Sequence, residues 1–153
     1  MPRPWPAPEI TEIEPGFTFD GGTWQLASAQ ATHAQPLLEC LGFSVQAAGK
    51  KVRVFKGYGD QHGHNRAVPR CQFLLHWCYR GAGEQLHPAL QAFSSDPGDV
   101  AHMAQSVGVK RLYLSHFRIH IDSETGHENA CADLQTRFAG DSGIVKDLEV
   151  FEI

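Results

Sequence analysis

Several features that would assign this 153-residue chain to a familiar class are missing from it. No apolar run approaches the ~20 residues that cross a bilayer, and the opening MPRPWPAPEI has no apolar core of the signal-peptide kind. We therefore expect no membrane association and a cytoplasmic location. The net charge of -4 gives no basic excess, which argues against a general nucleic-acid binder.

Cysteine is scarce and irregularly spaced. The four residues Cys40, Cys71, Cys78 and Cys131 form no CxxC pair. This predicts reduced, mostly buried thiols rather than disulfides or a zinc knuckle. Cys78 shares a strand face with His76, two positions earlier, but no orienting acid is evident, so a nucleophilic triad is disfavoured.

What is present predicts one domain. Four prolines in residues 1–9 favour an extended arm, followed by a single domain over 10–153. The early segments predict strands: two short ones in ITEIEPGFTFD around a Pro15-Gly16 turn, one in TWQLASAQATH, and a hairpin from 43–46 and 51–55 with Gly49 in its turn. CQFLLHWCY has the length and apolarity of a buried strand.

Helices alternate with strands in the second half. Residues 84–92 predict a short helix, and DPGDVAHMAQSVGV a longer one that Asp96 or Asp99 caps and Gly108 ends. HENACADLQTRFAG predicts another, with Ala130, Leu134, Arg137 and Phe138 along one side, and GIVKDLEVFEI closes with one or two strands. The fold class is therefore α/β (α+β), a mixed sheet with helices on one face.

The stretch KRLYLSHFRIHID places polar side chains at every second position: His116, Arg118, His120 and Asp122. On a strand these four would share one face, and Asp122 could orient a histidine ring as an accepting carboxylate. The alternative is that HIDSETGHE is the solvated start of a loop before the second helix.

A polar, glycine-rich loop at 56–70 is a separate candidate site. Asp60, His62 and His64 bring three ligand-type side chains within five residues, enough to fold around one ion. A solvated loop is equally compatible with this composition.

Several segments together resemble the C-terminal half of the metallo-β-lactamase superfamily. They are EIEPGFTFDGGTWQLASAQATH, LGFSVQAAGKKVRVFKGYGD, CQFLLHWCY, FAGDSGIVKDLEVFEI and, most specifically, VAHMAQSVGVKRLYLSHFR. The resemblance covers about residues 10–153 and implies half of an αβ/βα sandwich. In such a half, one face of the sheet is normally covered by the other half.

The resemblance also implies a metal site. His116 matches the family's last metal ligand, and Asp60 matches the bridging aspartate if two residues are inserted; without that insertion Tyr58 stands there. His33 and Tyr58 would line the pocket, and His120 and Asp122 would line it too or orient a metal ligand by a hydrogen bond. The metal would be Zn or Fe/Mn, or none, because the H-x-H-x-D-H motif of the other half is absent and HGHNRA at 62–67 matches only its start.

These implications lead to two expectations of function. One is a metal-dependent hydrolase of a small molecule, or a subunit of one, whose site a second chain completes. The other is a degenerate, non-catalytic subunit, a pseudoenzyme, that stabilises a partner. Both require a homodimer or a heteromer with another metallo-β-lactamase-like chain, because a lone half would expose an apolar face. A third reading is a fragment of a longer gene.

Overall fold

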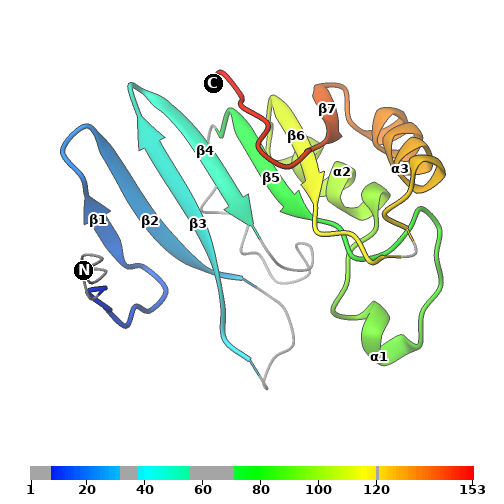
Figure 1. Ribbon diagram of the computed structural model, residues 1–153, viewed down its shortest axis with the longest axis horizontal. Helices are drawn as coiled ribbons and strands as arrows, with labels where there is room; N and C mark the ends of the chain where they lie inside the picture. Colours follow the sequence, from blue (N-terminus) through cyan, green and yellow to red (C-terminus); the bar gives the residue numbers. More distant parts are fainter. Residues whose placement is uncertain (1–7, 32–37, 56–70, 120) are drawn as a thin grey trace, which may run out of the picture.

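One seven-stranded sheet forms the centre of the computed structural model, which describes residues 8–31, 38–55, 71–119 and 121–153 (Figure 1). The strands lie side by side in chain order: β1 (Thr18–Asp20), β2 (Trp24–Ala31), β3 (Cys40–Ala47), β4 (Lys50–Phe55), β5 (Phe73–Trp77), β6 (Arg111–Ser115) and β7 (Asp141–Ile144). Neighbours from β1 to β4 are antiparallel, and those from β4 to β7 are parallel. The predicted mixed sheet is confirmed.

Local sequence signals account for the antiparallel half. β3 and β4 form the predicted hairpin, and its two turn residues, Ala48 and Gly49, both have positive φ, at 49° and 75°. Positive φ at both central positions matches the twist of paired strands. The expected strand before β1 is absent from the described residues. The segment before β1 is instead held by Ser28 on β2, whose Oγ accepts a hydrogen bond from the Phe17 N–H at 3.0 Å and donates one to the Glu14 carbonyl at 2.7 Å.

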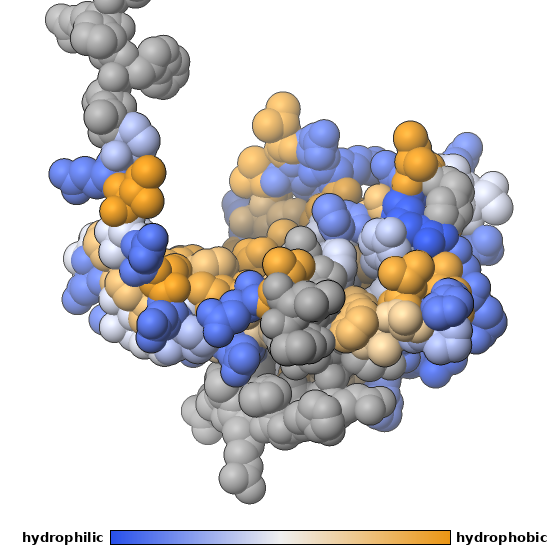
Figure 2. Space-filling model, turned by 90° about the horizontal axis from the view of Figure 1, so that it is seen from below, coloured by the Kyte–Doolittle hydropathy of each residue, from blue (hydrophilic) through white to orange (hydrophobic). Residues whose placement is uncertain are grey.

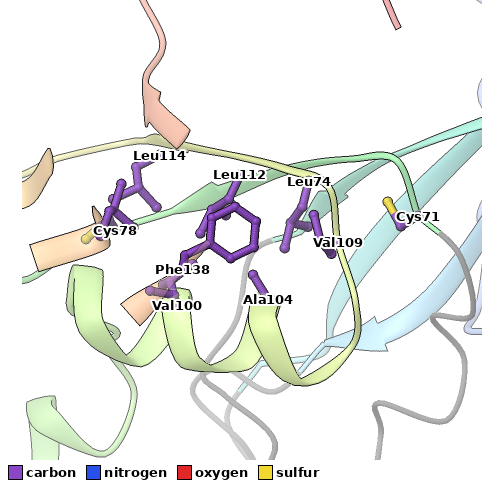
Figure 3. Packing of buried hydrophobic residues seen from close by; sticks show 11 residues of the cluster. Cys71, Leu74, Cys78, Val100, Ala104, Val109, Leu112, Leu114 and Phe138 are labelled. Carbon is purple, nitrogen blue, oxygen red and sulfur yellow. The ribbon is translucent and has the colours of Figure 1, made fainter. Parts of the chain in front are cut away.

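Two helices cover one face of the parallel half: α2 (Pro97–Ser106) precedes β6, and α3 (Glu124–Arg137) precedes β7. Parallel neighbours require such crossovers. A shorter helix, α1 (Pro88–Gln91), lies where a short helix was predicted. The apolar core fills the space between the sheet and α2 and α3 (Figure 3), and its members are Cys71, Leu74, Cys78, Val100, Ala101, Ala104, Val109, Leu112, Leu114, Leu134 and Phe138.

The helix stripes are largely as predicted. Val100 and Ala104 on α2 are buried, and Leu134 on α3 is fully buried. Arg137 is a correction: its side chain is exposed and pairs with Asp133 at 3.4 Å. The buried stripe of α3 runs in steps of four residues through Ala130, Leu134 and Phe138, and position 137 falls beside it.

The opposite face of the sheet, here called the open face, has no helix on it in the described part of the chain (Figure 1). Strand register puts several rows of side chains on it. One row comprises Phe19, Leu26, Val45, Val52, Phe73 and Arg111, a second comprises Ser28, Phe43, Val54, Leu75 and Tyr113, and a third comprises Trp24, Ala47 and Lys50. Figure 2 shows apolar residues along the hollowed upper side of the molecule. The antiparallel strands thus direct their apolar side away from the helices.

The C-terminal tail, residues 145–153, crosses part of this face instead of forming the second closing strand that the sequence allowed (Figure 1). The Phe151 ring packs on Phe73 and Tyr113, with centroids 5.0 and 4.7 Å away. No described helix is long and apolar enough to cross a membrane.

Candidate site at the carboxyl edge of the sheet

Five strands end at the same edge of the sheet, and this edge carries the candidate site. β2, β4, β5, β6 and β7 all run in one direction, because β2 and β4 are each antiparallel to β3 while β4 to β7 are parallel. Their last residues are Ala31, Phe55, Trp77, Ser115 and Ile144. Ligands of open α/β sheets bind outside the carboxyl ends of strands, so this edge is where the topology favours a site.

His116 is the first residue beyond β6 at this edge. Its backbone has φ 63°, in the left-handed region, and its side chain is exposed. Its ring lies on Trp77, the last residue of the neighbouring strand, with centroids 5.3 Å apart. A non-glycine residue in the left-handed region costs roughly 1–2 kcal/mol, and such residues cluster at functional sites.

The same backbone turn corrects the prediction of a longer strand. β6 stops at Ser115, so His116, Arg118 and Asp122 do not alternate along one strand face. The alternation of polar residues at every second position therefore lies in a turn that follows β6, and not on a strand. Its fourth member, His120, lies outside the described residues.

Arg118 turns toward the segment that follows β5. Its guanidinium binds the Glu84 carboxylate and lies 5.1 Å from the centroid of the Tyr79 ring. Tyr79 in turn packs on Trp77 at 5.9 Å, and Trp77 contacts His116. A continuous row of Arg118, Tyr79, Trp77 and His116 therefore links the ends of β5 and β6.

Asp122 lies just before α3 and pairs with a histidine of that helix. Its Oδ1 is 2.7 Å from Nε2 of His127, on the first turns of α3. The predicted role, orienting a histidine of the 116–120 stretch, stays a prediction because His120 is not described.

A buried ion-pair network behind this edge was missed by sequence reasoning. Arg80 is 3% exposed, and its Nη1 and Nη2 lie 3.2 Å from Asp96 and 2.6 Å from Asp99. It also donates to the carbonyls of Ser94 and Glu84, at 3.3 and 3.1 Å. Burial, then the Asp96 carboxylate, raises the pKa of Asp99. Asp96 or Asp99 was predicted to cap α2: Asp96 is the N-cap, and Asp99 completes a capping box with it.

Cys78 lies beside this network, and its thiol is expected to be unreactive. Burial, then the nearby Asp96, raises the pKa of its thiol far above the ordinary value, so little thiolate forms near neutral pH. All four cysteines are free, as predicted. His76, the suggested neighbour on the same face, is buried with Nδ1 2.6 Å from the Trp77 carbonyl.

The remaining predicted site residues lie outside the described part of the chain: His33, Tyr58, Asp60, His62, His64 and His120. In sequence, His33 follows the end of β2 by two residues, and Tyr58 and Asp60 follow the end of β4. Within the described ranges, no three His, Cys, Asp or Glu side chains come together to hold a metal ion. The described residues therefore do not by themselves fit a metal centre, and among them His116 is the ligand-type group that follows a parallel strand directly at this edge.

The comparisons agree with this geometry at the level of the fold. No family model matches the sequence, and no curated protein matches it. The metallo-beta-lactamase fold protein YhfI from Bacillus subtilis aligns with a TM-score of 0.69 and 16% identity, over 89% of this chain and 52% of that one. The short form of human tRNase Z aligns with a TM-score of 0.63 and 20% identity, over 88% of this chain and 44% of that one.

A third match carries a metal in its crystal structure. Zn2+-bound PqqB from Methylobacterium extorquens aligns with a TM-score of 0.66 and 11% identity, over 92% of this chain and 55% of that one. The chain thus has the metallo-β-lactamase fold, as its motifs predicted, and spans about half the length of these structures.

Proposed function

We propose that this chain is one half of a metal-dependent hydrolase, with its site at the carboxyl edge of the sheet and completed by a second αβ half that covers the open face. The observation that carries the proposal is His116. It lies at the carboxyl end of β6 with strained backbone geometry, an exposed ring and a fixed aromatic neighbour. A covering half would explain why β1 to β4 direct apolar rows away from α2 and α3.

His116 would be one metal ligand. Asp60 would be another from this chain, and His62 or His64 are the alternatives. When bound, a Zn, Fe or Mn ion would supply a hydroxide nucleophile near neutral pH. The described residues would position this site. The Trp77 ring limits the movement of the His116 ring, and the ion pair of Arg118 with Glu84 holds the segment after β5 beside it. The substrate would be a small ester, lactone, amide or phosphodiester.

Hydrolysis of chromogenic substrates tests this proposal. Purified protein is assayed with p-nitrophenyl acetate and bis(p-nitrophenyl) phosphate, with added Zn2+, Mn2+ or Fe2+ and with a chelator. The proposal predicts turnover that the chelator abolishes and that His116→Ala lowers at least about 100-fold. His102→Ala, an exposed histidine on α2, is the matched control and should retain activity. Equal activity in the two variants would contradict the proposal.

A second candidate is a non-catalytic subunit that uses the fold only to bind and stabilise a partner. Its support is the absence of H-x-H-x-D-H from the sequence, and of a three-residue ligand cluster from the described ranges. This candidate predicts that His116→Ala leaves assembly and cellular function unchanged.

A further inference from the structure

A pocket of about 210 Å³ lies next to the candidate site, between the segment after β5, the turn after β6 and the first turns of α3 (Figure 1). Phe117, which forms part of its wall, directly follows His116 in the chain. The pocket therefore adjoins the edge of the sheet that carries the candidate ligand. Its walls include Gly81 and Glu84 after β5, Phe117 and Ile121 in the turn, and Asn129 and Ala130 on α3.

Much of the wall of this pocket is apolar. Phe117 packs against the apolar core and Ala130 is buried, so both present hydrocarbon to the pocket. Gly81 has no side chain, and a Cβ atom at this position would lie 3.3 Å from Cγ2 of Ile121. Glycine is the residue that permits such a close approach, and a methyl group at position 81 would narrow the pocket.

The carboxylate in the wall, that of Glu84, is already paired. Its Oε1 binds the Arg118 guanidinium, and its Oε2 accepts a hydrogen bond from the Gly81 N–H at 2.9 Å. Both oxygens are thus engaged, and the charges of Glu84 and Arg118 cancel. An ion that entered the pocket would lose hydration without gaining an unpaired opposite charge, which costs free energy. The pocket therefore favours a neutral group.

Hydrogen bonds hold the walls of the pocket in place. The Glu84 carbonyl accepts from Nη1 of Arg80 at 3.1 Å, so the segment after β5 is fixed through its backbone as well as through the Glu84 side chain. Across the pocket, the amides of Ile121 and Asp122 both donate to the Arg118 carbonyl at 2.9 Å. A pocket whose walls are fixed before a ligand arrives loses little conformational entropy when it binds one.

The volume of the pocket matches a single aromatic ring or a branched alkyl group. An apolar protein cavity of about 150 Å³ is large enough to bind benzene. We propose that this pocket, here called the side-group pocket, binds a neutral apolar side group of the substrate, of the size of a phenyl or isobutyl group. The inference rests on the proposed function for the reaction, and it names the class of substrate: an ester or amide that carries such a group.

Binding of a neutral probe tests the side-group pocket without any reaction. Benzyl alcohol is titrated into isotope-labelled protein and followed by two-dimensional NMR, with benzoate and benzylamine as charged analogues of similar size. We expect saturable shifts of the Gly81, Phe117 and Asn129 amide signals, and dissociation constants at least about tenfold higher for both charged analogues. Equal affinity for the three compounds, or no shift of these signals, would overturn the inference.

Two variants test the fit of the probe. Gly81→Ala places a methyl group against Ile121, and Ile121→Ala removes apolar wall, so each should weaken benzyl alcohol binding at least about fivefold. Gly143→Ala on β7 is the matched control, because its added Cβ meets a similarly close neighbour, 3.2 Å away in Tyr113, outside the pocket. Thermal unfolding checks that each variant is folded. If both pocket variants bind the probe as Gly143→Ala does, the inference is wrong.

A pair of esters links the side-group pocket to the reaction. Methyl phenylacetate and methyl acetate differ only in a phenyl ring, and titration of the released acid follows both. The ratio of their kcat/KM values should fall at least about tenfold in Gly81→Ala and stay unchanged in Gly143→Ala. An unchanged ratio in Gly81→Ala would refute the role in substrate choice. Probe binding without hydrolysis of either ester would refute the hydrolase and keep the binding site, whereas hydrolysis without probe binding would do the reverse.

Discussion

Replacing Arg80 by Met should be among the most damaging single changes in the chain. Arg80 is buried, and its guanidinium is the common partner of two carboxylates, Asp96 and Asp99, and of two backbone carbonyls. Removing one partner of a fully buried ion pair costs about 3–5 kcal/mol. Here the Asp96 and Asp99 side chains are 18% and 39% exposed, so water partly solvates the charges left behind, and the loss should be about 2–3 kcal/mol. For a domain of this length, each kcal/mol lowers Tm by about 2–4 °C, so we expect Tm to fall by roughly 4–12 °C.

The pH dependence of this loss identifies its cause. Burial and the Asp96 carboxylate raise the pKa of Asp99, and removal of Arg80 takes away one of the cations that oppose the repulsion between the two carboxylates. A carboxyl whose folded pKa is raised destabilises the fold fully above that folded pKa, and the penalty declines as pH falls below it and is gone below the unfolded pKa. The difference in the free energy of unfolding between wild type and Arg80→Met should therefore decrease as the pH falls from about 7 to about 4. Urea unfolding at several pH values measures it; a loss below about 1 kcal/mol, or a loss independent of pH, would refute the reasoning.

Three further changes test separate parts of the structure. His116→Gly should keep stability within about 1 kcal/mol of wild type in urea unfolding, because glycine removes the left-handed strain as it removes the imidazole. A loss above roughly 2 kcal/mol, the size of a core defect, would mean that the ring has a structural role. Cys40 should react with Ellman's reagent at pH 8 well before Cys78, whose buried thiol has a raised pKa, and rapid labelling of Cys78 in native protein would contradict this. Gly126→Ala should destabilise α3, since the added Cβ would lie 2.1 Å from the Ile121 carbonyl oxygen; an unchanged Tm would show that the turn before α3 adjusts easily.

Features set by neighbouring residues could be predicted from the sequence. The cap at Asp96 and the buried positions Val100 and Ala104 follow from local spacing, and the structure has both. The hairpin turn at Gly49 is equally local. The fold itself was predicted from short motifs, of which the helix and strand ending in His116 were the most specific.

Features set by distant contacts or by backbone angles could not be predicted. The partners of Arg80 lie 16 and 19 residues away, in a segment that meets it only after α2 packs on the sheet. The period-two pattern after Ser115 shows which residue types occur but gives no information on the backbone angle φ. The turn at His116 was therefore not predicted. Docking of Phe151 on Phe73 likewise depends on tertiary packing across the sheet.

Metal content tests the central claim most directly. The protein is purified without chelators and kept in the oligomeric state in which it elutes. Its content of Zn, Fe and Mn is then measured by inductively coupled plasma mass spectrometry for wild type, His116→Ala and His102→Ala. We expect about one equivalent or more of metal per site in wild type and His102→Ala, and at least about a tenfold loss of metal in His116→Ala. Less than about 0.2 equivalent in the wild-type assembly, or equal metal in both variants, would contradict it.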